Sequence, residues 1–498
     1  MSTFHGLEMA KQALFTQQSA LYTTGHNISN ANTEGYTRQR VNFETTPAFP
    51  TGSRNRPQIP GQIGTGVQAG TVERIRDSFL DMQYRAENSK TGYWETMSES
   101  LYRMESLLNE PSESGLANTM DQFWQSLQDL SVDAQSESAR SVVVQRGIAV
   151  ADTFNYLSNN IESMQTDIRK QIDVTIDDAN SILRQIDRIN NQIKEIEPHG
   201  YLANDLYDER DRLIDKLSSI ANIKVHRVES AESAQDIAAG LAKIELVDDS
   251  GKSFASGPVY LVDPTGEPTY QEFDLAEDAE VNEITFGGNT IDLSSGSLKS
   301  LVDAHGYPGS GDKVVSYENM KANLAKLAET FVSEFNSVHQ EGYNYNGVQD
   351  TELKFFQIDE NGNVTVSEEI QDDPALIAAS SEEDASGNGE NAGELAKVMD
   401  KLINGNPLGD GASIKGFYEG LIGRLGVAAQ EANRMAQNTN ILRSQVEEQR
   451  VSVSSVSLDE EMTNMLKFQH AYNAAARSMT ATDEILDRII NNMGLVGR

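Results

Sequence analysis

The C-terminal end of the chain carries a long apolar stripe at helical spacing, and this stripe limits the fold more than any other feature. Between Ser457 and Met493, positions spaced alternately by four and three residues are mostly apolar; they are Leu458, Met462, Met465, Gln469, Tyr472, Ala476, Met479, Asp483, Leu486, Ile490 and Met493. A mean spacing of about 3.5 residues keeps such a stripe against a partner helix. Ser457 and Glu460 form a capping box, which predicts where the helix begins.

A second, weaker stripe lies at the N-terminal end, in a helical pattern from about Thr3 to about Asn30. Its apolar positions recur every seven residues, at Leu7, Leu14, Leu21 and Ile28, and the positions between them are Ala10, Gln17 and Thr24. An apolar stripe needs a partner surface, so we expect the two stripes to pack against each other or against copies in other molecules. An ordinary intramolecular core is the alternative interpretation.

Composition excludes several classes of partner and chemistry. The chain has 498 residues, which predicts two to four domains, and its formal net charge is −36. Such an acidic surface argues against nucleic acid and anionic membranes as partners. The absence of cysteine excludes disulfides, thiolate nucleophiles and cysteine-ligated metals.

The sequence has no apolar run long enough to span a bilayer and no cleavable signal peptide, because Glu8 interrupts an N-terminus that lacks a basic region. We therefore expect a chain that is either cytoplasmic or exported by a route that removes nothing.

The middle of the chain alternates between helical and extended patterns. Residues 41–90 carry prolines and glycines and predict an extended linker with short strands. Residues 91–223 and 313–456 carry long helical stripes, including one from Phe154 to Ile196 and a shorter one from Asn204 to Ile220, and predict an elongated helical rod. Residues 224–312 are rich in β-formers and predict an inserted β domain, with a hairpin turn at Gly287-Gly288. The fold class is therefore mainly α with a β-rich insert.

The sequence gives little support for catalysis or metal binding, and we expect no cofactor. Its seven histidines are scattered, and no zinc, phosphate-loop or nucleophile-elbow motif is present. His470 is best interpreted as a histidine on a helix surface. Asp359, Asn361 and Asn363 resemble the start of a calcium loop, but Gly362 is misplaced, so a hairpin over 355–366 is favoured. An enzyme or a binding surface within the β insert remains an alternative.

Several motifs resemble the bacterial flagellar rod, hook and hook-associated proteins. The N-terminal motif runs from Asn27 through Asn32, Gly35 and Tyr36 to Arg38, and the C-terminal one comprises 456–462, 468–472, 474–477 and 483–487. A C-cap and turn alone would explain Asn32 and Gly35, but not Tyr36 or Arg38. Three internal pieces resemble the hook-associated protein 1 family; they are 204–211, 334–342 with Asn346-Gly347, and Ala139-Arg140 after the Phe123-Trp124 helix. The resemblance covers most of the chain outside 224–312.

The resemblance implies a non-enzymatic structural subunit that joins hook to filament. It implies that residues 1–40 and 457–498 together form a coiled-coil inner domain, that the helical rod lies outside it, and that the insert projects from the surface. The implied partners are copies of the chain, the hook protein, a second junction protein and through it the filament, and a cytoplasmic export chaperone at the C-terminal helix. The implied location is extracellular, at the hook–filament junction. Another axial component and a secreted binding protein using the insert are the alternatives.

We hypothesise that the terminal segments order only when neighbouring molecules bury their stripes, because an isolated amphipathic helix is marginal in water. The expected interface residues are Leu7, Leu14, Leu21, Ile28, Asn32, Gly35, Tyr36, Leu458, Met462, Met465, Tyr472, Met479, Leu486 and Ile490. Gln469 and Asp483 interrupt the C-terminal stripe, either to set its register or to face a polar channel.

Overall fold

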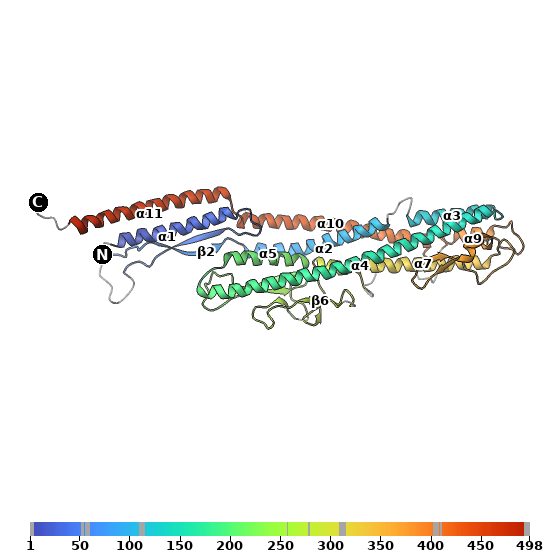
Figure 1. Cartoon of the computed structure of the whole chain (residues 1–498), viewed down its shortest axis with the longest axis horizontal. Coiled ribbons are helices and arrows are strands. Elements are labelled where there is room, and N and C mark those ends of the chain that lie inside the picture. The colour runs from blue at the N-terminus through green and yellow to red at the C-terminus, as the bar shows by residue number, and fades with distance from the viewer. Residues whose placement is uncertain are drawn as a thin grey trace. The chain divides into compact units, whose positions relative to one another are not determined.

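The computed structural model describes the chain except for residues 1–3, 51–53, 55–59, 109–114, 256, 277–278, 308–314, 402–407, 409–410 and 493–498. The described residues form a mainly α fold with a β-containing segment (Figure 1). The helices are α1 (His5–Ser29), α2 (Ser78–Leu108), α3 (Leu116–Val132), α4 (Glu137–Ile196), α5 (Asn204–Ile220), α6 (Ser297–His305), α7 (Tyr317–Glu341), α8 (Glu368–Asp372), α9 (Glu390–Lys397), α10 (Ile414–Ser454) and α11 (Leu458–Asn492), with 3-10 turns η1 (Glu197–His199) and η2 (Pro374–Leu376).

Within the described parts of the chain, the strands form four small antiparallel sheets. They are β1 (Gln39–Thr45) with β2 (Val67–Arg74); β3 (Ile223–Val228), β4 (Leu241–Leu246) and β5 (Val259–Val262); β6 (Phe273–Asp274), β7 (Thr285–Phe286) and β8 (Asn289–Thr290); and β9 (Phe356–Ile358) with β10 (Val364–Val366). In the first sheet Gln39 pairs with Arg74 and Thr45 with Val67, and a bulge lies between Val41 and Phe43.

The chain divides into two compact units. Unit 1 comprises Met1–Asn88, Ala179–Glu272 and Asn440–Arg498, and unit 2 comprises Ser89–Asp178 and Phe273–Thr439. The boundary falls within α2, α4 and α10, each of which contributes to both units. Unit 1 contains both terminal helices, so it is the unit that bears on the assembly hypothesis.

Unit 2 has an aromatic core that draws on separate parts of the sequence. Six buried phenylalanines pack with ring centroids 4.8–6.4 Å apart; they are Phe123, Phe154, Phe331, Phe335, Phe355 and Phe356. They come from α3, α4, α7 and the β9 hairpin, so one cluster fastens three helices and a hairpin together.

Many sequence expectations are confirmed at the level of single elements. α5 has the predicted bounds, β9 and β10 form the predicted hairpin, and Gly287-Gly288 joins β7 to β8. Others are corrected. The longest helix begins at Glu137 instead of near Phe154, and α6 lies within the segment expected to be β-rich. The extended region after β2 ends early, because the Asp77 carboxylate accepts a bond from the amide of Phe79 at 2.8 Å and starts α2 at Ser78.

The four-part domain organisation stays a prediction. Within it, β3 to β5 of the predicted insert belong to unit 1, whereas β6 to β8 and α6 belong to unit 2.

Candidate assembly site at the terminal helices

The terminal helices α1 and α11 lie side by side in unit 1 and run antiparallel (Figure 1). Near the start of α1, a Cβ built on Gly6 would lie 3.7 Å from the methyl carbon of Thr482, late in α11. Near the end of α1, the Asn27 amide donates to the Glu461 carboxylate at 3.1 Å, early in α11. The two contacts are three heptads apart on each helix, so one register satisfies both.

The side chains that α1 and α11 bury are few and mostly small. Those of α1 are Ala10, Thr16, Ala20, Thr24 and Asn27. Between 458 and 490, α11 fully buries only Glu461 and Leu486, while a half-buried stripe comprises Asn464, Met465, Phe468, Ala471, Ala475, Ala476 and Thr482. The packing that holds α11 in place is therefore thin.

The predicted C-terminal stripe is only partly buried. Leu486 is buried and Met465 is half-buried, but Leu458, Met462, Tyr472, Met479 and Ile490 are exposed, Ile490 at 69%. Leu466, Ile485 and Ile489 are exposed as well. These eight exposed residues (458, 462, 466, 472, 479, 485, 489 and 490) are called the outer face of α11. Met493 lies outside the described residues.

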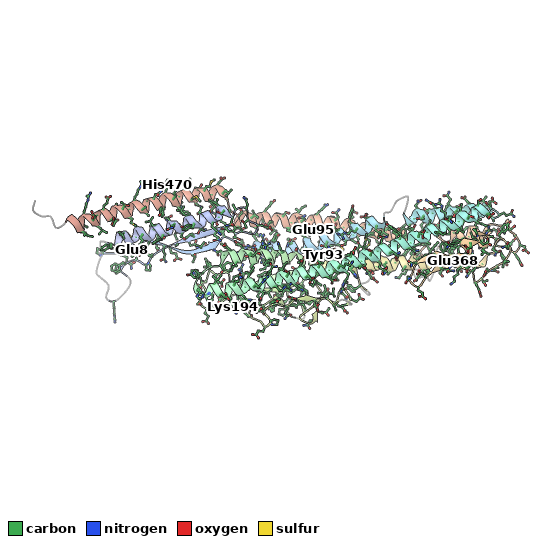
Figure 2. All side chains as sticks on the ribbon, viewed as in Figure 1. Glu8, Tyr93, Glu95, Lys194, Glu368 and His470 are labelled. Atoms are coloured by element: carbon green, nitrogen blue, oxygen red, sulfur yellow. The ribbon has the colours of Figure 1, made fainter. Side chains whose placement is uncertain are left out.

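The polar positions of the stripe also face outward. Gln469 and Asp483 are exposed, and His470 stands exposed on α11 as expected (Figure 2).

The predicted N-terminal stripe lies beside the buried face of α1. Its residues Leu7, Leu14, Leu21 and Ile28 are half-buried. The exposed side of α1 carries three aromatic rings, Phe4, Phe15 and Tyr22. Both terminal helices thus leave large apolar side chains in solvent within unit 1.

The N-terminal motif that follows α1 is held by a network of hydrogen bonds around Asn27. The Asn27 amide nitrogen donates to the Gln39 carbonyl at 2.8 Å, and its amide oxygen accepts from the Gln39 backbone at 3.0 Å and from the Tyr36 hydroxyl at 2.8 Å. Burial and the nearby carboxylates of Asp205, Asp208 and Glu461 raise the pKa of Tyr36, which keeps its hydroxyl a donor. Asn27 therefore fixes the start of β1 against the end of α1.

Gly35 and Asn32 have different positions in the same turn. Gly35 has φ +79°, and a Cβ there would touch the Arg212 side chain at 3.4 Å, so the turn favours glycine. Asn32 is exposed.

Arg38 connects this motif to the start of α11. Its guanidinium donates from Nε to Glu461 at 2.8 Å and from its two terminal nitrogens to Glu460 at 2.7 and 3.0 Å. Its backbone amide donates to the Ser454 carbonyl at 2.9 Å. α11 begins at Leu458, as the capping box predicts, but the Glu460 side chain bonds Arg38. Two segments at opposite ends of the sequence are joined here.

The Asn204–Asp211 motif supplies carboxylates to a buried ion network beside the hairpin. Asp208 accepts from the Thr37 amide at 3.0 Å and pairs with Arg74 at 2.8 Å. Asp211 pairs with Arg74 at 3.0 Å and also with Arg76 and Arg85. Burial alone would raise the pKa of Asp211, but these three arginines hold it well below its usual range. The motif thus fastens α5 to β2 and α2.

The remaining motifs bind the parts of unit 2 together. Asn336 donates to the Phe356 carbonyl at 2.8 Å and accepts from the Phe355 and Phe356 amides, so it clamps β9. His339 accepts from the Ala378 amide at 3.1 Å. Arg140 donates to the Ile377 carbonyl at 2.7 Å. These residues are buried and bonded to backbone, which indicates a structural role.

Among the described residues, no cluster of histidines and carboxylates suits a metal ion, and no helix is both long and apolar enough to cross a membrane.

Comparison with known proteins agrees with these motifs. Residues 101–356 match the model of the flagellar hook-associated protein FlgK helical domain. Residues 7–37 match the flagella basal body rod protein model, and 447–493 match the flagellar basal body rod FlgEFG protein C-terminal model. The flagellar hook-associated protein 1 of Bacillus subtilis is 43% identical over the full length of both chains. The chain belongs to the flagellar hook-associated protein 1 family.

More distant relatives have the same name or fold. The hook-associated protein 1 of Escherichia coli is 24% identical over 97% of this chain and 98% of its own. The structure of the flagellar hook junction protein FlgK from Burkholderia pseudomallei, at 13% identity, matches with a TM-score of 0.57 and covers 75% of this chain and all of that one. Membership of the hook-associated protein 1 family makes this chain a structural component of the flagellum. It favours this family over the other axial components that the sequence motifs left as alternatives.

Sequence reasoning did not foresee the pairing of Glu461 with Arg38. Both stand within the quoted motifs, but no local pattern shows that a carboxylate in the first turn of α11 meets an arginine at the other end of the sequence.

Proposed function

We propose that this protein joins the flagellar hook to the filament, and that copies of it contact one another through the outer face of α11. The observation that carries the proposal is this set of eight exposed apolar residues, spread over the part of α11 that its own chain leaves uncovered. A soluble protein rarely exposes such a set unless a partner covers it. The exposed aromatic rings of α1 extend the apolar surface available within unit 1.

Formation of the helix pair is proposed to be coupled to assembly. A single α11 gains little by docking on α1, because the described part of α11 fully buries only Glu461 and Leu486. Copies that cover the outer face would add the missing apolar burial, at roughly 25 cal/mol per Å² of area removed from water. Polymerisation would then be confined to a growing end, where a neighbour is already ordered.

The proposed partners follow from the family name and from the motifs. Hook protein would lie on one side of a layer of copies, and a second junction protein, followed by the filament, on the other. Before export, a cytoplasmic chaperone would cover the outer face of α11. Each of these partners would meet an apolar surface that the free chain leaves in solvent.

The test introduces a charge into the outer face. In cells whose own copy is deleted, Met462→Asp and Leu466→Asp variants should reach the medium but should not be retained on hooks, and filament number should fall at least tenfold by electron microscopy. Each aspartate would place an unpaired charge in a dry interface, which costs several kcal/mol.

Ala474→Asp is the matched control, because Ala474 is exposed on α11 and none of the eight outer-face residues lies three, four or seven positions from it. It should be retained on hooks like the unchanged protein. Normal filaments on cells carrying Met462→Asp and Leu466→Asp together would refute the proposed interface.

A further inference from the structure

We propose that Glu461 sets the register of α11 on α1, and so determines where the outer face of α11 is presented. The inference deepens the proposed function, on which it rests for its consequence, but it concerns contacts within one chain. Sequence reasoning offered Gln469 and Asp483 for such a role, and both are exposed. Glu461 is 2% exposed and is bonded to Asn27 and Arg38.

The rest of the α1–α11 interface specifies register weakly. Coiled coils choose a register through large side chains that fit particular holes and through buried polar residues. The fully buried side chains of α1 are alanine, threonine and asparagine. On α11, the large residues at the interface are Met465, Phe468 and Leu486; the Phe468 ring meets Phe43 edge-to-face at 5.8 Å, yet Phe43 is itself 43% exposed. A slip by one heptad would place Ala475 at the position of Phe468 in one direction and Met479 at that of Leu486 in the other, so apolar packing favours the observed register only in part.

Glu461 makes such a slip costly. If α11 moved by one heptad, Phe468 would stand opposite Asn27 in one direction, and no residue of α11 would stand there in the other, because the helix begins at Leu458. Glu461 would leave its partners in both cases. The buried amide of Asn27 would lose an acceptor, and Arg38, 17% exposed, would lose both of its carboxylate partners, because Glu460 lies on the same helix as Glu461. A buried charge or polar group without its partner costs roughly 1–3 kcal/mol or more.

The same residue also links register to the N-terminal motif. Asn27 can present its amide nitrogen to Glu461 because Tyr36 and Gln39 occupy its amide oxygen, and Arg38 reaches Glu461 from the next turn of the motif. Asn27 and the motif after α1 thus form a binding site for one carboxylate of α11. Since the outer face belongs to the same helix, a shifted register would displace that face by a full heptad relative to unit 1.

The test measures register directly with paired cysteines, because the chain has none of its own. Gly6→Cys is combined with Thr482→Cys for the observed register, and with Ala475→Cys or Ile489→Cys for a slip of one heptad in either direction. Disulfide yield under mild oxidation is measured in the purified full-length chain and on hooks isolated from cells. With Glu461 present, the 6/482 pair should exceed each slipped pair at least tenfold.

Replacement of Glu461 should lower this preference. Glu461→Ala should reduce the ratio of 6/482 to slipped disulfides about tenfold, whereas Glu461→Gln, which keeps an acceptor for Asn27, should reduce it less. Glu460→Ala is the matched control, because it removes a 56% exposed partner of the same arginine and should change the ratio less than twofold.

Two outcomes would overturn the inference: an unchanged ratio in Glu461→Ala, or an equal loss of all three disulfides, which would mean that Glu461 stabilises the pair without choosing its register. Failure of the proposed function would give a different result. If copies do not contact one another through the outer face, the outer-face variants would be retained on hooks like the unchanged protein, while the disulfide ratio would still depend on Glu461.

Discussion

At the scale of single residues, the motifs of this family member are buried polar groups that hold backbone segments together. Asn336 satisfies three backbone groups of β9 and its approach, and a Cβ on Gly342 would overlap the side chain of Asn391. Such positions tolerate little change, because a buried backbone group that loses its partner keeps its full cost of desolvation. They are visible in sequence as motifs, but their partners are not.

His339 gives unit 2 a specific sensitivity to acid. It is 2% exposed, and burial lowers its pKa from 6.5 to about 4, partly opposed by Leu353 and Asp350. Below pH 6.5 the unfolded chain binds a proton at this position and the folded chain does not, so stability falls as the pH drops from 6.5 to about 4. The shift corresponds to on the order of 3 kcal/mol.

A His339→Gln variant should lose this part of the acid sensitivity, since its side-chain oxygen can still accept from the Ala378 amide. Urea unfolding at pH 7 and at pH 4 measures the difference. The unfolding free energy of the variant should fall less than that of the unchanged chain by about 3 kcal/mol. Equal losses in the two proteins would show that His339 does not titrate in this range.

At the scale of elements, the sequence predicts well where helices lie along the chain, but it predicts poorly which elements they pack against. Apolar spacing predicts where α5 and α11 begin, because capping and periodicity are local. Periodicity does not show which side of α11 faces its own chain: the predicted stripe contains buried Leu486 and exposed Met462 alike. The buried side includes Glu461, whose bonding partners Asn27 and Arg38 lie more than four hundred residues away in the sequence. A charged residue in a first turn is ordinarily interpreted as solvent-facing.

The first part of the segment 224–312, which belongs to unit 1, is hydrogen-bonded to buried side chains of that unit. Asn190 exchanges two hydrogen bonds with the backbone of Ala242, and Arg210, 0% exposed, donates to the Gly240 carbonyl at 2.7 Å. The buried Glu197 accepts from the Gly240 amide at 3.0 Å. Removal of the segment would take these backbone partners away from three buried polar side chains, which would keep only their bonds within the rest of unit 1.

Deletion of 224–312 should therefore abolish filament attachment by unfolding unit 1, at a cost of several kcal/mol. Thermal unfolding of the purified variant, followed by circular dichroism, measures this loss. A variant with glycine at positions 249–252, which are exposed, is the control and should melt and attach filaments normally. Filaments on cells that carry the deletion would instead indicate a dispensable surface domain.

At the scale of the whole molecule, charge and apolar surface act in opposite directions. A net charge of −36 keeps free chains apart, whereas the outer face of α11 favours association. Repulsion between like charges is screened by salt over about 8–10 Å near physiological ionic strength, while apolar burial is not. Association is then expected to depend on correct alignment of the apolar faces, since misaligned copies meet charge against charge. The register of α11 on α1 within one chain therefore affects how well the apolar faces of neighbouring copies align.

Coupled ordering predicts that both ends of the free chain are open to proteases and become protected on assembly. Trypsin should cut the purified monomer at Lys467, Arg477 and Arg488 on α11 and at Lys11 on α1, all exposed, before it cuts the buried network around Asp211. Cleavage requires local unfolding of the helix. Of the described residues of α11, two are fully buried, so local unfolding of this helix costs little free energy. On isolated hooks the same sites should be cut at least tenfold more slowly, as measured by mass spectrometry of timed digests. A monomer whose terminal helices resist trypsin as long as α5 does would mean that α1 and α11 pair stably without neighbours, and assembly would then join preformed surfaces.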